Sequence, residues 1–232
     1  MIQVAAVVPA AGVGRRFGSR TPKLFVRLHD RPLLAHALCA LQQCPAIRWI
    51  ILVVERRQYR RAQTLLKRYR ITKALALCIG GSSRAESVAH GVKMLPPEAR
   101  WVLVHDGARP CASLAVIDRA IREAKRYGAV ACGLPATLTV KAANRQGLVQ
   151  ETLKRDPLWF VQTPQVFRRD WLTQALARVD LRRGSFPDDA AILEASGFPV
   201  RLIAGDPLNI KVTTREDLYL AEAILKRRKD YA

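Results

Sequence analysis

Acidic residues are scarce in this sequence: 19 Asp and Glu stand against 39 Lys and Arg among 232 residues, a formal net charge of +20. Such an excess indicates anionic partners, namely phosphorylated small molecules, nucleic acid or a membrane surface. Aromatic residues are also few, at 6%. Only Tyr59 and Tyr69 are interleaved with the cations of the basic segment 56–73, so the pattern of a nucleic-acid-binding surface is weak. We interpret this segment and the basic run 226–229 as solvated helix faces.

Long hydrophobic runs are missing as well. The longest, 4–13 and 50–54, fall well short of the roughly 20 residues that a membrane-spanning helix requires. The N-terminus lacks the succession of basic, apolar and small residues that marks a secretory signal, so we expect a cytoplasmic protein without a membrane segment. The five cysteines are scattered without Cys-x-x-Cys spacing, which argues against a disulfide framework and a zinc site and indicates core thiols.

Strand and helix patterns alternate along the chain, and half of the residues are hydrophobic, enough for a sizeable core. β-rich apolar runs cover Val4–Val8, Trp49–Val54, Leu75–Ile79, Trp101–His105, Ala129–Leu134 and Val200–Ile203. Helical periodicity covers Leu33–Gln43, Tyr59–Tyr69, Ala85–Met94, Leu114–Tyr127, Trp171–Val179, Asp189–Ser196 and Arg215–Arg228. This alternation predicts an α/β fold with a mostly parallel, twisted sheet flanked by helices. Without repeats or a flexible linker, we expect one domain over 1–232.

One segment, about 136–156, departs from this alternation. Polarity alternates over Thr137–Lys141 and Leu148–Leu153, on either side of Asn144-Arg145-Gln146-Gly147. This pattern predicts a β-hairpin inserted as an arm. Such an arm either closes a site, grips a second subunit or forms an ordinary edge hairpin, and spacing alone leaves these alternatives open.

The turn after the first strand is rich in small residues and cations. Pro9-Ala10-Ala11-Gly12-Val13-Gly14-Arg15-Arg16-Phe17-Gly18 lets backbone N–H groups approach a ligand, and Lys23 follows closely. A dinucleotide fingerprint would need glycine in place of Phe17, and a Walker loop would need Gly-Lys-Ser/Thr; both are missing. The cluster Arg15, Arg16 and Lys23 suits a triphosphate. The alternative is a structural turn with incidental surface charge.

Two further strand ends carry candidate site residues. Gly80-Gly81-Ser82-Ser83-Arg84 supplies a glycine turn with Ser82 or Ser83 as helix N-cap, and its functional interpretation is a ribose or base contact. Asp106 follows the fourth strand, at the sheet edge where α/β proteins bind ligands. Beside a triphosphate, such a carboxylate suits Mg²⁺, whereas the structural alternative is an ion pair with Arg109. We interpret His105 as a packed histidine, because no nucleophile motif accompanies it.

Together these segments resemble the 2-C-methyl-D-erythritol 4-phosphate cytidylyltransferases of the non-mevalonate isoprenoid pathway, over nearly the whole chain. The matching pieces are Pro9–Arg16 with Pro22-Lys23, Gly80–Val88, Val104–Pro110, Thr163–Phe167 and Asn209–Thr213. The resemblance implies a Rossmann-like nucleotidyltransferase fold, a homodimer paired through the arm, Mg²⁺ as cofactor, and CTP and a sugar-alcohol phosphate as substrates. It implies no covalent intermediate, since the substrate phosphate attacks the α-phosphorus of CTP directly and expels pyrophosphate.

Site residues also follow from the resemblance. The catalytic cations that it implies are Arg16, Lys23 and Lys211, and the implied metal ligand is Asp106. The implied CTP-binding residues are Pro9, Ala10, Ala11, Gly12, Gly14, Arg15, Gly81, Ser82, Ser87 and Gly107. The implied substrate-binding residues are Arg109, Thr139, Arg155 and Thr163, with Thr139 and Arg155 on the arm and contributed across the dimer.

Two positions depart from the family pattern: Leu138 stands where an aspartate is usual, and Pro187 where a threonine is usual. Both lie in substrate-facing regions, so a ribitol-5-phosphate cytidylyltransferase is the nearest alternative enzyme. A nucleic-acid-binding protein on a nucleotidyltransferase fold is the alternative of another class, motivated by the charge. Arg16, Lys23, Asp106 and Lys211 argue against it, because a pure binder needs no metal-site carboxylate within a phosphate pocket. No cyclase domain of the bifunctional relatives is expected.

Overall fold

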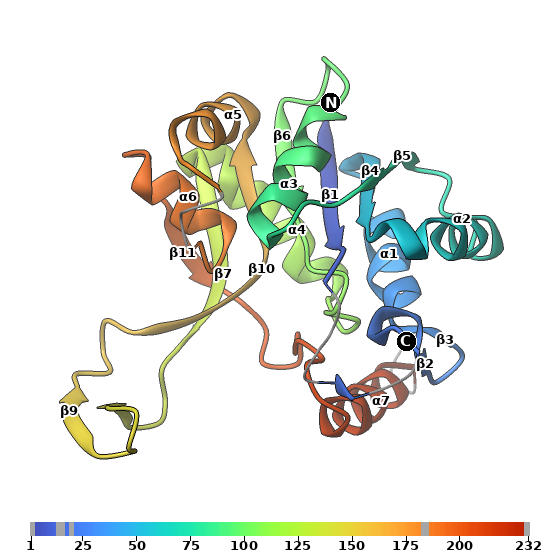
Figure 1. The fold of residues 1–232 in the computed structure, drawn as a ribbon. Coiled ribbons are helices and arrows are strands. Elements are labelled where there is room, and N and C mark those ends of the chain that lie inside the picture. The colour runs from blue at the N-terminus through green and yellow to red at the C-terminus, as the bar shows by residue number, and fades with distance from the viewer. Residues whose placement is uncertain (1–2, 13–16, 19–20, 182–185, 230–232) are drawn as a thin grey trace.

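A computed structural model of the chain describes residues 3–12, 17–18, 21–181 and 186–229. Its central sheet has seven strands in the order β11-β7-β10-β6-β1-β4-β5 (Figure 1). Their bounds are β1 (Val4–Ala10), β4 (Ile47–Val54), β5 (Ala74–Ile79), β6 (Trp101–Val104), β7 (Ala129–Pro135), β10 (Trp159–Arg168) and β11 (Arg201–Ala204). Neighbouring strands pair in parallel, except that β10 runs antiparallel to both β6 and β7. The predicted mostly parallel sheet is confirmed.

Helices cover both faces of this sheet, because successive side chains of its strands point to opposite sides. Val4, Ala6 and Val8 of β1 pack into one core, whereas Ala5 and Val7 pack into the other. The first core is covered by α1 (Leu33–Gln43), α2 (Tyr59–Arg68), α4 (Leu114–Tyr127) and α7 (Glu216–Lys229). The second is covered by α3 (Arg84–Lys93), α5 (Arg169–Arg178) and α6 (Asp189–Ala195).

The predicted elements agree closely with these bounds, but β10 was not predicted. That strand contains a proline and two glutamines, and proline normally disfavours a central strand. Its pairing with β7 is interrupted between Val161 and Gln165, which accommodates the proline. Short elements complete the fold: the 3₁₀ turns η2 (Lys23–Phe25) and η3 (Arg56–Gln58), and the paired strands β2 (Arg27–Leu28) and β3 (Arg31–Pro32).

The predicted arm is a separate two-stranded sheet of β8 (Val140–Ala143) and β9 (Val149–Leu153), which projects from the central sheet (Figure 1). The Asn144 side chain accepts from the backbone N–H groups of Gln146 and Leu148, and Gly147 has φ +81°. The left-handed conformation at Gly147 closes the hairpin. Pairing begins at Val140, not at Thr137 as predicted.

The cysteines are free thiols, with Cys44, Cys111 and Cys132 buried and Cys39 and Cys78 half-buried. Burial raises the pKa of Cys132 to about 12, so this thiol is unreactive at neutral pH. In the described ranges no helix is both long and apolar enough to cross a membrane.

Gly91 lets α3 lie close against β1 and β4. A Cβ atom there would lie 2.6 Å from Val7 Cγ1 and 2.9 Å from Val53 Cγ2. We expect Gly91→Ala to lower the free energy of unfolding by about 1–3 kcal/mol, because overpacking of this buried contact outweighs the gain in helix propensity. Urea unfolding checks this expectation. The matched control is Lys93→Ala at an exposed position of the same helix, and equal stability of the two variants would contradict the close approach.

Candidate active site

A cavity of about 480 Å³ lies outside the carboxyl ends of β1, β4, β5 and β6. Ala10 ends β1 there, and Glu55, Gly81 and Asp106 come shortly after the ends of β4, β5 and β6. The chain places β4 and β5 on one side of β1 and β6 on the other, so β1 marks the point where strand order reverses. Open α/β sheets bind ligands at this position.

Many predicted site residues line this cavity: Pro9, Ala10, Ala11, Gly12, Lys23, Gly81, Ser82, Ser87, Asp106 and Lys211. Five further lining residues were not assigned individual roles from the sequence: Leu24, Glu55, Ser83, Arg84 and Ala108. Of these, Ser83 and Arg84 belong to the segment Gly80–Arg84, for which the sequence suggested a ribose or base contact. The predicted residues Gly14, Arg15 and Arg16 lie outside the described part of the chain.

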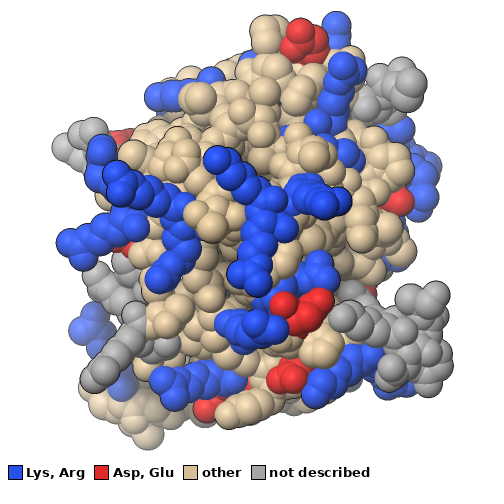
Figure 2. All heavy atoms as spheres, turned by 90° about the vertical axis from the view of Figure 1, so that its right-hand side faces the viewer, with Lys and Arg blue, Asp and Glu red and all other residues tan. Residues whose placement is uncertain are grey.

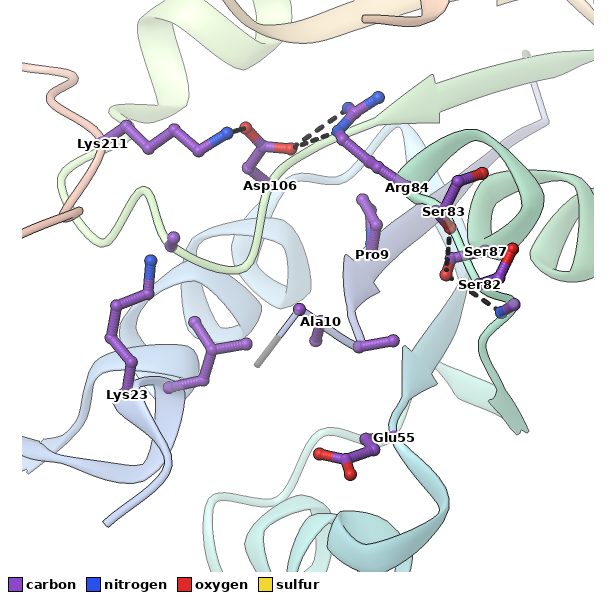
Figure 3. Close-up of a pocket in the computed structure, with 15 residues that line it drawn as sticks. Pro9, Ala10, Lys23, Glu55, Ser82, Ser83, Arg84, Ser87, Asp106 and Lys211 are labelled. Carbon is purple, nitrogen blue, oxygen red and sulfur yellow. Dashed lines mark hydrogen bonds and ion pairs between the residues drawn. The ribbon is translucent and has the colours of Figure 1, made fainter. Parts of the chain in front are cut away.

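The turn after β5 is built from side-chain hydrogen bonds to the backbone. Ser83 is the N-cap of α3, and its Oγ accepts from the N–H of Glu86. Ser87 Oγ accepts from the N–H of Gly81 at 3.1 Å and donates to the carbonyl of Ser83. The Glu86 carboxylate holds Ser82 through its N–H and its hydroxyl. These bonds fix the glycine turn along one wall of the cavity (Figure 3).

Asp106 lies between cations at the end of β6 (Figure 3). Its Oδ2 accepts from Lys211 Nζ at 2.8 Å, and its Oδ1 accepts from Arg84 Nε at 3.1 Å. Arg109 Nε is 3.8 Å from Oδ2. Burial favours the neutral carboxyl, but the charges of Arg84 and Lys211 outweigh it and hold the pKa of Asp106 well below its usual range. The carboxylate is therefore ionised throughout the physiological pH range.

Arg84 joins Asp106 to a second buried carboxylate. It is the first residue of α3, and its Nη2 donates to Asp189 Oδ2 at 2.8 Å. Asp189 begins α6 and is fully buried. Burial disfavours the charged guanidinium, yet Asp189 and Asp106 raise the pKa of Arg84 above its ordinary value. The position of Arg84 after a serine N-cap, within the motif Gly80–Val88, was the signal available in the sequence.

Lys23 enters the cavity from η2, separately from Asp106 and Lys211 (Figure 3). Its Nζ donates to the carbonyl of Val212 at 2.8 Å. This bond ties η2 to the segment that carries Lys211. Three cations from distant parts of the chain, Lys23, Arg84 and Lys211, therefore line the cavity together with two carboxylates. This excess of positive charge suits a phosphate-rich ligand.

A buried hydrogen-bond chain supports the backbone of Asp106. Thr163 Oγ1 accepts from the Asp106 N–H at 3.0 Å and lies 3.1 Å from His105 Nδ1. The other ring nitrogen of His105 lies 3.4 Å from the carbonyl of Arg109, an acceptor, so Nε2 carries the proton and Nδ1 accepts from the threonine. His105 is therefore a packed, neutral histidine, as expected from the sequence.

Burial lowers the pKa of His105 to about 4. The unfolded chain binds a proton near the ordinary histidine pKa of about 6.5, so the free energy of unfolding falls as the pH falls from about 6.5 to about 4. We expect His105 to contribute about 3 kcal/mol to this loss. Urea unfolding across this range checks it, and His105→Gln is expected to make the loss smaller by about this amount. An unchanged pH profile in the variant would contradict the assignment.

The family model of 2-C-methyl-D-erythritol 4-phosphate cytidylyltransferase matches residues 4–227. Relatives of that name from Desulforamulus reducens and Dehalococcoides mccartyi are 44% and 42% identical, over 98% and 97% of both chains. The chain belongs to this family. A solved structure, 4-diphosphocytidyl-2C-methyl-D-erythritol synthase from Anaerococcus prevotii, superposes with a TM-score of 0.84 at 27% identity, covering 97% of this chain and 99% of that one.

Members of the cytidylyltransferase family transfer a nucleotidyl group, and by membership this chain is a nucleotidyltransferase. Several residues assigned from the family resemblance are next to the cavity but are not among the residues that line it. Arg109 is buried and donates to the carbonyl of Asn209, and Thr163 is engaged by Asp106 and His105. Gly107 follows Asp106, and its N–H donates to the carbonyl of Pro9.

The arm residues assigned to the family's substrate site are exposed. Thr139 precedes β8, and Arg155 follows β9, where it donates to the carbonyl of Thr137. Neither lines the cavity of its own chain. Leu138, which departs from the family pattern, is 74% exposed.

One carboxylate at the cavity, that of Asp106, is suited to a divalent metal ion. Among the described residues, no group of three or more His, Cys, Asp or Glu is placed to hold a metal ion. Asp106 nevertheless offers an ionised carboxylate at the cavity. Magnesium is commonly bound in this way, by one or two carboxylates and by substrate phosphates. The donor set thus fits a metal that is bound together with a nucleotide.

Proposed function

We propose that the cavity binds CTP and transfers its cytidylyl group to 2-C-methyl-D-erythritol 4-phosphate. A phosphate oxygen of the acceptor forms a bond to the α-phosphorus of CTP, the bond to the leaving oxygen breaks, and pyrophosphate departs. The observation that carries this proposal is the convergence of Lys23, Asp106 and Lys211 on one cavity beside the backbone of Pro9–Gly12. The family membership supplies the identity of the reaction.

The catalytic cations act by position and charge. Lys23 and Arg16 hold the triphosphate, and Lys211 stabilises charge that develops at the α-phosphate. Asp106 orients Lys211 through their 2.8 Å ion pair. Arg15 assists at the phosphates. The roles of Arg15 and Arg16 rest on the family resemblance alone.

In our proposal, the cytidine moiety is recognised on the side of the cavity away from Lys23 and Lys211. Pro9–Gly12 and Gly81 line the cavity and offer backbone groups, and Ser82 and Ser87 order the turn through the bonds described above. The roles of Gly14 and Gly107 in this pocket rest on the family resemblance alone. Backbone donors and acceptors held in fixed positions distinguish the edge of one pyrimidine from another, because mismatched polar groups would remain buried and unpaired.

The acceptor phosphate lies toward Arg109 and Thr163, and Thr139 and Arg155 come from the arm of a second subunit. Both arm residues are exposed, and neither lines the cavity of its own chain, which supports a homodimer in which each arm reaches its partner. Asp106 would hold Mg²⁺, which neutralises phosphate charge when bound. A cytoplasmic location belongs to the same proposal.

Pyrophosphate release tests this function. We expect turnover with CTP, Mg²⁺ and 2-C-methyl-D-erythritol 4-phosphate, and little with ribitol 5-phosphate or when UTP replaces CTP. Preference for ribitol 5-phosphate would reassign the acceptor and implicate Leu138 and Pro187. Absence of turnover with both acceptors would overturn the proposal.

A further inference from the structure

The segment from Arg56 to Lys73 carries eight Lys and Arg side chains and no Asp or Glu. It forms η3, α2 and the turn toward β5. Helix α2 buries only Ala62 and Leu65, so most of these cations are exposed. Within the described ranges, none of the eight pairs with a carboxylate. Figure 2 shows Lys and Arg side chains gathered on this side of the molecule, with few acidic ones between them.

A groove of about 520 Å³ lies between α2 and the chain around η2. Arg60, Thr64 and Arg68 line it at intervals of four residues, and Arg61 follows Arg60. This spacing places three guanidinium groups along one side of the helix. Apolar and aromatic residues complete the groove: Phe25, Pro32, Leu65 and Tyr69.

The arginines are held in place over the rings of the groove. The Arg61 guanidinium lies 5.5 Å from the centroid of Phe25, and that of Arg68 lies 5.9 Å from the centroid of Tyr69. Arg60 and Arg61 also stand in the first turn of α2, which has no acidic residue. Cations at this end of a helix oppose its dipole, so these residues do not serve the stability of the helix. Such local conflicts concentrate at functional sites.

We propose that this groove is a second ligand site, which binds an organic phosphate. Guanidinium groups form paired hydrogen bonds with phosphate oxygens, and three of them suit a phosphate monoester or diphosphate. The apolar surface of Leu65, Pro32 and the two rings then accepts the organic group. The groove therefore selects a small ligand that is anionic at one end and apolar at the other.

Other anionic partners fit the same surface less well. Nucleic acid binding without sequence preference relies on a succession of aromatic rings that stack with successive bases, and among the described residues only two rings, those of Phe25 and Tyr69, line this groove. A membrane-surface helix exposes an apolar face. The exposed residues of α2 are all polar: Arg60, Arg61, Gln63, Thr64, Lys67 and Arg68.

The groove is linked to the proposed CTP site through η2. Lys23 of this turn lines the first cavity, and Phe25 of the same turn lines the groove. A ligand that draws Arg61 away from Phe25 changes the contacts that fix the turn and so the position of Lys23. Binding at the two sites is then coupled, and the coupling is reciprocal. This coupling rests on the proposed function, whereas the existence of the groove site does not.

Calorimetric titration with phenyl phosphate tests the site in the full-length protein. The groove variant is Arg61→Gln/Arg68→Gln, and the matched control is Arg56→Gln/Arg57→Gln, which removes the same charge from neighbouring exposed positions outside the groove. We expect the groove variant to lose one class of site, with affinity there reduced by about tenfold or more. The control should bind as the wild type does. Duplex DNA and anionic vesicles are titrated in parallel.

Equal weakening in both variants would overturn the proposal, as would failure of the wild type to bind phenyl phosphate. Tighter binding of DNA or vesicles, lowered equally by both pairs of substitutions, would replace it with a general polyanion surface. The coupling predicts that phenyl phosphate changes the KM for CTP in the wild type and control but less in the groove variant. If the wild type binds phenyl phosphate at the groove but shows no cytidylyltransferase activity, the proposed function fails and the groove site stands.

Discussion

Replacing Lys23 with alanine lowers turnover by about a hundred- to a thousandfold. The substitution removes a cation that enters the cavity from η2, separately from Lys211. Positive charge that is already in place when the transition state forms needs no reorganisation, so its loss falls mainly on kcat. The bond to the Val212 carbonyl is lost as well, at a cost of about 1 kcal/mol in stability. Steady-state kinetics with varied CTP measures both kcat and KM.

Two variants control for this result. Lys23→Arg keeps the charge and is expected to recover part of the activity. Lys93→Ala removes an exposed lysine outside the cavity and is expected to leave kcat unchanged. A loss smaller than about tenfold in Lys23→Ala would mean that this lysine has no direct role at the phosphates.

Replacing Arg84 with methionine lowers the free energy of unfolding by about 3–5 kcal/mol. The substitution removes the cation that pairs with the fully buried Asp189, and among the described residues Asp106 then keeps Lys211 and Arg109. Burial already raises the pKa of Asp189 with Arg84 beside it, so the solitary carboxylate is harder still to keep ionised. Urea unfolding at neutral pH measures the loss.

The double variant Arg84→Met/Asp189→Asn separates the buried charge from lost packing. We expect it to be more stable than Arg84→Met, because no charge is then left unpaired at position 189. The folded state of Arg84→Met binds a proton at Asp189 more readily than the unfolded chain does. The difference in the free energy of unfolding between the wild type and Arg84→Met should therefore become smaller as the pH falls. Equal stability of the single and double variants at neutral pH would show that Asp189 does not depend on Arg84.

Much of this fold could be predicted because hydrophobic periodicity is local. Helices α1 and α4 have the bounds that their periodicity predicts, and buried parallel strands such as β4 are recognisable as continuous apolar runs. Strand β10 could not be found in this way. Its central position depends on neighbours far away in sequence, β6 and β7, and on a register interruption around Pro164. Local propensity alone argues against that strand.

Some features of the site could also be predicted from the sequence, and others could not. Glycine turns and the carboxylate after β6 were visible in the sequence, since strand ends determine where ligands bind. The part played by Arg84 was not visible, because it depends on Asp189, a residue 105 positions later in the chain. Thr163 was assigned to the substrate, yet the fold also uses its hydroxyl to hold the backbone of Asp106. Substrate kinetics and urea unfolding of Thr163→Val separate these two roles of the hydroxyl.

The chain passes from the cavity directly onto the basic surface: Glu55 lines the cavity, and Arg56 begins the stretch of exposed cations. A field of one sign beside a binding site accelerates the encounter with oppositely charged ligands, and dissolved salt screens it beyond about 10 Å at 0.1 M. CTP is such a ligand. Capture of the nucleotide is therefore expected to slow as ionic strength rises, while the bond-making step, shielded within the cavity, keeps its rate.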